Sequence, residues 1–148
     1  MPHDELAWQL SEQTFLLPDF LHRHAPQAGL PRLHRRALLH AHCHHKAVFG
    51  LDPEESLLTD MGIELEVPAT GCCGMAGAFG FEQGDHYDLS VACGERVLLP
   101  EARRAAADTL IIADGFSCRE QIAQCTQREA WHVADLLQLA WRVTGDDE

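Results

Sequence analysis

The segment that decides the fold is Thr109-Leu-Ile-Ile-Ala113, in the second half of the chain. It is short, apolar and rich in β-branched side chains, which is typical of a strand buried in a parallel sheet. Ser117 and Glu120 follow with the spacing of a capping box, so a helix is predicted to begin at Cys118. A buried strand that leads into a helix in this way is characteristic of α/β proteins.

The rest of the chain also alternates between strand and helix patterns. The other predicted strands span residues 36–42, 63–67 and 130–132. The predicted helices span residues 4–23, 52–62, 86–99, 102–107 and 133–142, with Pro100 ending the third. We therefore expect a single α/β domain with a small, largely parallel sheet flanked by helices, plus an N-terminal helix. Residues 1–30 are predicted to form this helix and a linker, and residues 31–148 the α/β domain.

Four cysteines follow the ends of three predicted strands. Cys43 comes directly after the first strand, Cys72 and Cys73 follow the second, and Cys118 follows the third. In parallel α/β sheets, ligands collect beyond the carboxyl ends of the strands. The sequence therefore predicts that four thiols meet at one edge of the sheet.

The other two cysteines and the tryptophans have simpler interpretations. Cys93 and Cys125 lie within predicted helices and are interpreted as structural residues, because small cysteines are often buried. Trp8, Trp131 and Trp141 are expected to be core anchors, because large aromatic side chains bury the most apolar area.

Composition and charge exclude several classes of protein. The 148 residues include 11 basic and 23 acidic side chains, which gives a net charge of −12 with histidine neutral. Such a balance argues against nucleic-acid binding, and an apolar content of 46% argues against general disorder. No secretory signal or membrane-span pattern is present, so we expect a cytoplasmic location, with peripheral attachment at the inner membrane only through a partner. In a reducing compartment, clustered cysteines bind metals or carry out redox chemistry more often than they form disulfides.

A glycine-rich loop surrounds the adjacent pair Cys72-Cys73. Gly71, Gly74 and Gly77 are candidate cofactor-binding positions, because glycines let backbone N–H groups approach sulfur closely. Cys118 is expected in the first turn of a helix, where the helix dipole favours a thiolate.

The chemistry of four thiolates leaves two kinds of metal centre open. Four thiolates suit either a tetrahedral zinc ion or an iron–sulfur cluster. The short C-x₂-C knuckles that are common in zinc sites are absent, and an adjacent cysteine pair is unusual for zinc. The pattern therefore favours an iron–sulfur cluster.

Four histidines crowd around Cys43, at positions 40, 42, 44 and 45. Alternate residues of a strand point to opposite faces, so only some of these histidines can reach one metal. His44 is the candidate for a cofactor-binding or replacement ligand. His40 is interpreted as a strand histidine whose hydrogen bonds are satisfied.

Three stretches resemble the cysteine-rich CCG domain family: His40-Ala-His-Cys-His44, Gly71-Cys-Cys-Gly-Met-Ala-Gly77 and Phe116-Ser-Cys118. This family includes a component of heterodisulfide reductase and the iron–sulfur subunit of glycolate oxidase. It also includes the carboxy-terminal regions of FAD-linked oxidases and dehydrogenases that act on D-2-hydroxy acids. The run from Asp114 to Glu120 most resembles that last group, and the resemblance covers about residues 37–142.

The resemblance implies a ligand set. Matched by position, Cys43 is the family's first cysteine, Cys72 and Cys73 are its pair, and Cys118 is its last. The family pattern commonly ends in C-x-x-C, but Gly115 stands at the first of those two positions. Four thiols are present where five are common, so a 4Fe–4S cubane, a different metal and a site without metal all stay open.

The resemblance also implies a function and partners. The chain would be an iron–sulfur electron-transfer module of an FAD-linked 2-hydroxy acid oxidoreductase, with no complete active site and no catalytic residue of its own. FAD would lie on a partner domain or subunit with dehydrogenase activity, and a quinone or another carrier would accept the electrons. Two alternatives remain: a structural zinc domain that serves the assembly of a larger dehydrogenase, and a thiol–disulfide redox domain that uses the Cys72-Cys73 region.

Overall fold

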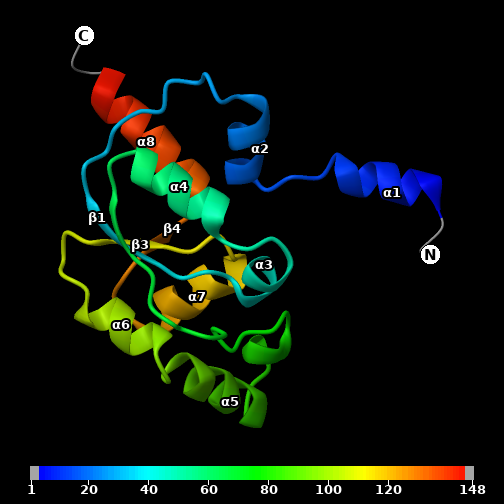
Figure 1. Ribbon diagram of the computed structural model, residues 1–148. Helices are drawn as coiled ribbons and strands as arrows, with labels where there is room; N and C mark the ends of the chain where they lie inside the picture. Colours follow the sequence, from blue (N-terminus) through cyan, green and yellow to red (C-terminus); the bar gives the residue numbers. More distant parts are fainter. Residues whose placement is uncertain (1–3, 146–148) are drawn as a thin grey trace.

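Within residues 4–145, which the computed structural model describes, four short strands form one parallel sheet (Figure 1). The strands, in the spatial order β2-β1-β3-β4, are β1 (Arg36–Leu39), β2 (Glu64–Glu66), β3 (Leu110–Ile112) and β4 (Ala130–Trp131). Leu38 of β1 pairs with Glu66 of β2 on one side and with Ile111 of β3 on the other. The predicted α/β class with a parallel sheet is confirmed, and every strand lies inside its predicted range.

The described part of the chain also contains eight α-helices. They are α1 (Glu5–Glu12), α2 (Leu17–His24), α3 (Cys43–Val48), α4 (Asp52–Asp60), α5 (Asp85–Gly94), α6 (Leu98–Arg104), α7 (Phe116–Cys125) and α8 (Val133–Gly145). A 3-10 turn, η1 (Phe79–Phe81), lies before α5. Among residues 4–145, no helix combines the length and the apolar character that are needed to cross a bilayer.

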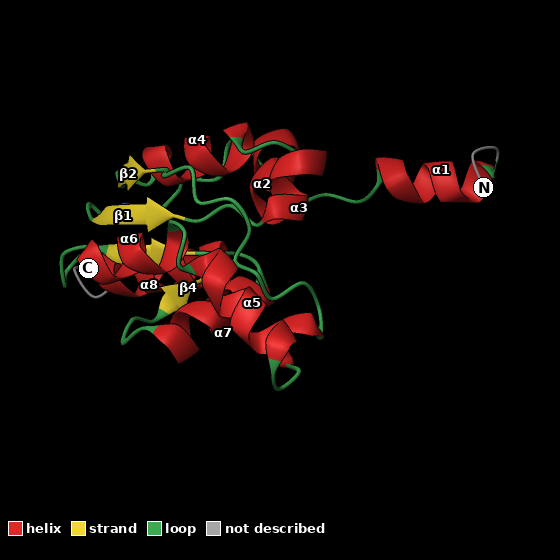
Figure 2. Cartoon of the chain, turned by 90° about the horizontal axis from the view of Figure 1, so that it is seen from below, coloured by secondary structure: helices red, strands yellow, loops and turns green. Residues whose placement is uncertain are grey.

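The two faces of the sheet carry separate hydrophobic clusters. Leu39 and Ile112 pack on the face that α2, α4 and α8 cover, in a cluster of aliphatic side chains. Leu38 and Ile111 point to the other face, where they pack with residues of α6 and α7 and with Cys73 and Cys118. This alternation follows from the pleat of a strand. Figure 1 shows α4 and α8 on one side of the strands and α5, α6 and α7 on the other, and Figure 2 shows the same strands in yellow from below.

The predicted single helix at the N-terminus is two helices, α1 and α2. Pro18 lies in the first turn of α2, where its missing N–H is tolerated, whereas it would break a helix that continued through it. Leu17 and Leu21 of α2 pack against the core, but none of the residues of α1 is buried. In Figure 1, α1 stands apart from the rest of the molecule.

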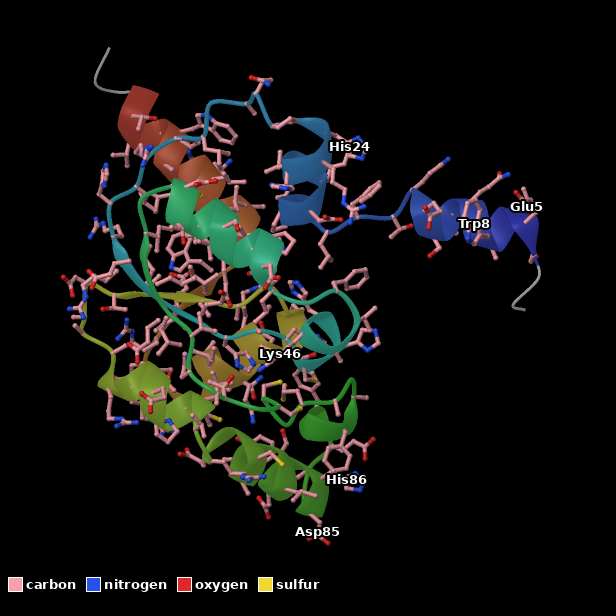
Figure 3. All side chains as sticks on the ribbon, in the orientation of Figure 1. Glu5, Trp8, His24, Lys46, Asp85 and His86 are labelled. Atoms are coloured by element: carbon pink, nitrogen blue, oxygen red, sulfur yellow. The ribbon has the colours of Figure 1, made fainter. Side chains whose placement is uncertain are left out.

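The expectation that all three tryptophans anchor the core is wrong for two of them. Trp8 lies on α1 and is 61% exposed, and Trp141 on α8 is 53% exposed. Figure 3 shows Trp8 far from the sheet. Only Trp131, on β4, is partly buried against the core.

Two predicted helix boundaries are also wrong. The break in residues 86–107 falls at Glu95–Val97, and Pro100 lies in the first turn of α6, where a proline is tolerated, rather than ending a helix. The predicted capping box does not form. The helix α7 begins at Phe116 with Gly115 as its N-cap, so Ser117 lies inside the first turn and caps nothing.

Candidate metal centre

Four cysteines reach the same edge of the sheet from three adjacent strands. Cys43 is the first residue of α3, a helix not predicted from the sequence, which follows β1. Cys72 and Cys73 lie in the loop after β2, and Cys118 lies in the first turn of α7, after β3. Because the strands are parallel, their carboxyl ends lie together. We call these four cysteines the thiol rim.

Cys43 and Cys72 form the exposed pair of the thiol rim. Their Sγ atoms lie 3.9 Å apart, and both residues are free cysteines. The backbone N–H of Gly74 donates a hydrogen bond to Cys72 Sγ at 3.3 Å. Partial desolvation raises the pKa of Cys72, and the Gly74 N–H opposes this shift because it stabilises the thiolate.

Cys73 and Cys118 form the buried pair, with exposed fractions of 3% and 1%. The hydrogen bond between the two thiols lowers the pKa of Cys73 and raises that of Cys118, and burial raises the pKa of Cys118 further. The opposite directions of the two pKa shifts arise because two thiolates so close would repel each other, which favours one thiol and one thiolate in the pair. The expectation that the dipole of α7 favours a Cys118 thiolate stays a prediction, and the hydrogen bond to Cys73 and burial act against it by raising the pKa of Cys118.

His40 supports the buried pair. It is completely buried directly after β1, where its backbone N–H bonds to the carbonyl of Ile112. Its Nδ1 lies 2.6 Å from Thr70 Oγ1, and the imidazole lowers the pKa of Cys73 after the larger effect of Cys118. Among the described residues its Nε2 has no partner with ordinary hydrogen-bond geometry. The interpretation of His40 as a satisfied strand histidine therefore holds for only one ring nitrogen.

The glycine-rich loop needs glycine at one position above all. Gly74 has φ +97°, and a Cβ there would lie 2.1 Å from the carbonyl oxygen of Ser90. No side chain fits between the Gly74 backbone and the Ser90 carbonyl. In this position the Gly74 N–H also donates its hydrogen bond to Cys72 Sγ. Gly71 and Gly77 also have positive φ, but the space around them is open. Cofactor binding by the three glycines stays a prediction.

The histidines around Cys43 have different surroundings. His44 is exposed on α3, whereas His42, the N-cap residue of α3, is partly buried against Gly115. Lys46, labelled in Figure 3, lies on the same short helix and is exposed. His44 and His42 both line a pocket beside the thiol rim. The role predicted for His44 stays a prediction, and His42 is the histidine nearer to the turn that carries Cys118.

A buried carboxyl group lies next to α3. Glu54, in the first turn of α4, is 2% exposed, and its Oε2 lies 3.5 Å from Nδ1 of His45. Burial raises the pKa of Glu54 to about 8, with smaller contributions from Asp114 and Glu55. Burial also lowers the pKa of His45. Sequence reasoning missed this residue, because nothing in the pattern distinguishes Glu54 from its neighbour Glu55.

Asp114 connects the end of β3 to the start of α8. Its Oδ1 accepts a hydrogen bond of 2.8 Å from the backbone N–H of Val133, and its Oδ2 lies 3.7 Å from His132 Nε2. The side chain therefore fixes the turn between β3 and α7 against the last helix. The Asp-Gly dipeptide after a buried strand signals a turn in the sequence, but not this contact.

A pocket of about 280 Å³ opens beside the thiol rim. Its apolar wall includes Leu16, Leu17 and Phe49, and its polar wall includes His42, His44 and Asp114. The pocket therefore offers both an apolar surface and imidazole groups, two of them on the residues that flank Cys43 in the chain.

Cys93 and Cys125 lie outside the thiol rim. Both are partly buried on helices, and Cys125 packs against the cluster beneath α6 and α7. The backbone carbonyl of Cys125 accepts a hydrogen bond from Arg103. These positions agree with their interpretation as structural residues.

The thiol rim consists of two close pairs and is not assembled as one set of metal ligands. In residues 4–145, no three His, Cys, Asp or Glu side chains are grouped closely enough to hold one metal ion. The ligands of a cluster bind different iron atoms and stand further apart than the ligands of one ion. As a set of donors, the four thiols, the backbone N–H on Cys72 Sγ and the unpaired imidazole nitrogen beside Cys73 suit a thiolate-bound cluster, although the 3.9 Å between Cys43 Sγ and Cys72 Sγ is short for ligands of different irons.

Comparisons with known proteins find two curated dehydrogenases. The chain is 33% identical over 107 residues to D-2-hydroxyglutarate dehydrogenase of Pseudomonas putida, covering 70% of this chain and 10% of that protein. It is 33% identical over 103 residues to one of the subunits of anaerobic glycerol-3-phosphate dehydrogenase from Escherichia coli, covering 69% of this chain and 25% of that polypeptide. No protein-family model and no solved structure matches the chain.

These relatives place the chain in a coarse class. It is similar to segments of two oxidoreductases, and it spans about a tenth of one and a quarter of the other. The predicted relation to oxidoreductases is confirmed at this level.

Proposed function

We propose that the chain belongs to the CCG domain family and is the iron–sulfur electron-transfer module of an FAD-linked 2-hydroxy acid oxidoreductase. The observation that carries the proposal is the meeting of Cys43, Cys72, Cys73 and Cys118 at one edge of a parallel sheet. The similarity to D-2-hydroxyglutarate dehydrogenase supports the substrate class.

The four cysteines of the thiol rim are the residues that would hold a 4Fe–4S cluster. When bound, such a cluster supplies one-electron transfer. The chain itself controls the surroundings of the sulfur ligands. Cys73 and Cys118 are shielded from water by the core, Gly74 donates its N–H to Cys72, and His40 stabilises the Cys73 thiolate. Hydrogen bonds to sulfur and burial are the means by which proteins tune such centres.

Two observations support the proposed partners: the small share of each relative that this chain spans, and the pocket beside the thiol rim. FAD would lie on a partner domain or subunit, which agrees with the small share of each relative that this chain spans. The pocket beside the thiol rim, lined by Leu17, Phe49 and His44, is the place where a quinone or another electron carrier would approach. Its apolar wall suits a flat organic acceptor, and its imidazoles offer hydrogen bonds to an oxygen atom.

The experiment is anaerobic purification of the full chain, followed by absorbance, iron and sulfide measurements. We expect brown protein with broad absorbance near ~400 nm and with both iron and acid-labile sulfide. Cys73→Ser should lose the colour and the iron. Cys125→Ser makes the same replacement of sulfur by oxygen at a cysteine outside the thiol rim. It is the matched control and should keep the colour and the iron. Wild-type protein without metal or sulfide would contradict the proposal.

A structural zinc site is the second candidate, and one distance favours it. The 3.9 Å between Cys43 Sγ and Cys72 Sγ is close to the edge of a zinc–thiolate tetrahedron, which is about 3.8 Å for Zn–S bonds of about 2.3 Å. Colourless protein with about one zinc per chain would establish this alternative and remove the cluster.

A further inference from the structure

The two exposed cysteines of the thiol rim are close enough to react with each other. Cys43 and Cys72 follow β1 and β2, which are neighbouring parallel strands, so both residues leave the sheet at the same edge. Their Sγ atoms lie 3.9 Å apart, and both cysteines are free and exposed. The two sulfur atoms need to approach by about 1.9 Å to reach the S–S bond length of about 2.0 Å.

The surroundings of the two exposed cysteines leave room for this approach. The helix α3, which begins at Cys43, has no buried residue. On the other side, Gly71 precedes Cys72 in the chain, and the space beside its Cα is open. The approach therefore takes place between exposed side chains and does not require the packing of α3 to change.

The other cysteines do not compete for either partner. Cys73 is adjacent to Cys72, but it is 3% exposed and shares a hydrogen bond with Cys118, which is 1% exposed. An oxidant in solution reaches exposed thiols more readily than buried ones. Cys93 and Cys125 lie on α5 and α7, outside the thiol rim. The pair that an oxidant meets is therefore Cys43 and Cys72.

We propose that Cys43 and Cys72 form a reversible disulfide when the thiol rim is empty, and that this bond prevents the rim from binding metal. The formation of the bond is independent of the cluster proposed above, whereas its effect on metal loading rests on that proposal. A disulfide offers no thiolate, so the oxidised rim keeps only Cys73 and Cys118 as sulfur ligands. Reduction returns both exposed thiols.

Oxidised glutathione, a small-molecule disulfide, is sufficient as the oxidant. One thiol of the pair loses its proton to solvent and attacks a glutathione sulfur, so that a protein–glutathione S–S bond forms and one glutathione thiolate leaves. The second thiol loses its proton in the same way and attacks the protein sulfur of that bond. The Cys43–Cys72 bond then forms and the second glutathione thiolate leaves. The pair gives up two electrons and two protons, and one oxidised glutathione becomes two reduced ones.

The first test treats the metal-free full chain with oxidised glutathione in the presence of a chelator. We expect the loss of two titratable thiols, no bound glutathione, and a Cys43–Cys72 cross-link in peptide mapping by mass spectrometry. Cys43→Ser and Cys72→Ser should each keep one glutathione instead, because the second thiol is absent. Cys125→Ser is the matched control and should form the same cross-link as the wild type. No reaction, glutathione retained by the wild type, or a bond between other cysteines overturns the proposal.

The second test compares metal uptake by the oxidised and the reduced chain. During anaerobic reconstitution, the oxidised chain should take up at least about tenfold less iron, since loss of even an outer partner of a metal site costs about 10–100-fold in affinity. Dithiothreitol should restore the uptake. Equal uptake by the two forms overturns the effect of the bond on metal binding. A reduced chain that takes up no iron overturns the proposed function together with this effect, and leaves the disulfide itself standing.

Discussion

The two halves of the thiol rim have the same chemical groups in opposite environments. Cys73 and Cys118 belong to the hydrophobic cluster under α6 and α7, and a hydrogen bond joins their two free thiols. Cys43 and Cys72 are exposed and lie 3.9 Å apart, and α3, which carries Cys43, has no buried residue. The buried pair is thus part of what holds the sheet together, whereas the exposed pair depends on the sheet without supporting it.

From this difference we expect that metal binding and folding can be separated in this protein. A substitution in the buried pair should affect both the metal and the stability of the metal-free chain. A substitution in the exposed pair should affect the metal alone. Variants in and around the two pairs can test this separation, and their expected effects on stability differ widely.

The largest loss of stability is expected from Gly74→Ala. Gly74 follows the buried Cys73 in the chain, and its N–H donates to Sγ of the exposed Cys72. The new Cβ would lie 2.1 Å from the carbonyl oxygen of Ser90, at a φ of +97°. We expect a loss of more than about 4 kcal/mol in the free energy of unfolding, or failure to fold. Urea unfolding followed by circular dichroism measures it. Gly77→Ala, where the space is open, is the control and should cost about 1 kcal/mol; equal costs for the two variants would refute the packing argument.

The second expected change in stability concerns Glu54, which is buried beside His45 of α3, the helix that begins at Cys43. Its pKa is about 8 when folded and 4.5 in its unperturbed form. The folded state therefore holds this proton more tightly, and its contribution to stability is complete below pH 4.5 and lost as the pH rises to about 8. Glu54→Gln should gain on the order of 2–4 kcal/mol relative to wild type between these limits.

Unfolding free energies of the metal-free chain across this pH range provide the measurement for Glu54→Gln. Glu55→Gln removes the same charge one residue away and serves as the control. A difference between Glu54→Gln and wild type that does not change with pH would show that Glu54 is not held in its acid form.

The third effect is that of Cys118→Ser in the metal-free chain. A hydroxyl in place of this buried thiol places a more polar group in an apolar cluster, which should cost about 1–3 kcal/mol. Denaturant titration of the apoprotein gives the number. A cost below about 0.5 kcal/mol would show that the buried pair does not belong to the core.

The smallest effect on stability is expected from Cys43→Ser. Its side chain is exposed and its helix has no buried residue, so the metal-free chain should lose no more than about 0.5 kcal/mol. The same variant should lose its iron during anaerobic purification. Retention of iron together with a large loss of stability would reverse the roles assigned to the two halves.

The sequence predicts the sheet well, for a physical reason. Segments such as Thr109–Ala113 must be apolar on both faces to lie inside a parallel sheet, and this requirement leaves a visible pattern. Strand positions then place Cys43, Cys72, Cys73 and Cys118 at one edge, because the ends of parallel strands coincide.

What the sequence does not predict depends on tertiary contacts. Glu54 is buried where it lies 3.5 Å from His45 of α3, and no local sequence pattern indicates this contact. The place of His42 depends on a turn more than 70 residues away in the chain, at Gly115. The boundary between α1 and α2 was available in principle, because Pro18 marks it.

The exposure of Cys43 and Cys72 also gives a direction to assembly. The rim exists only after β2, β1 and β3 have paired, so its ligands are scattered in the unfolded chain. Under the proposed function, incoming iron would meet the exposed thiols first and the buried ones last. We therefore expect the outer pair to be the entrance of the site, and the inner pair to decide how long its contents stay.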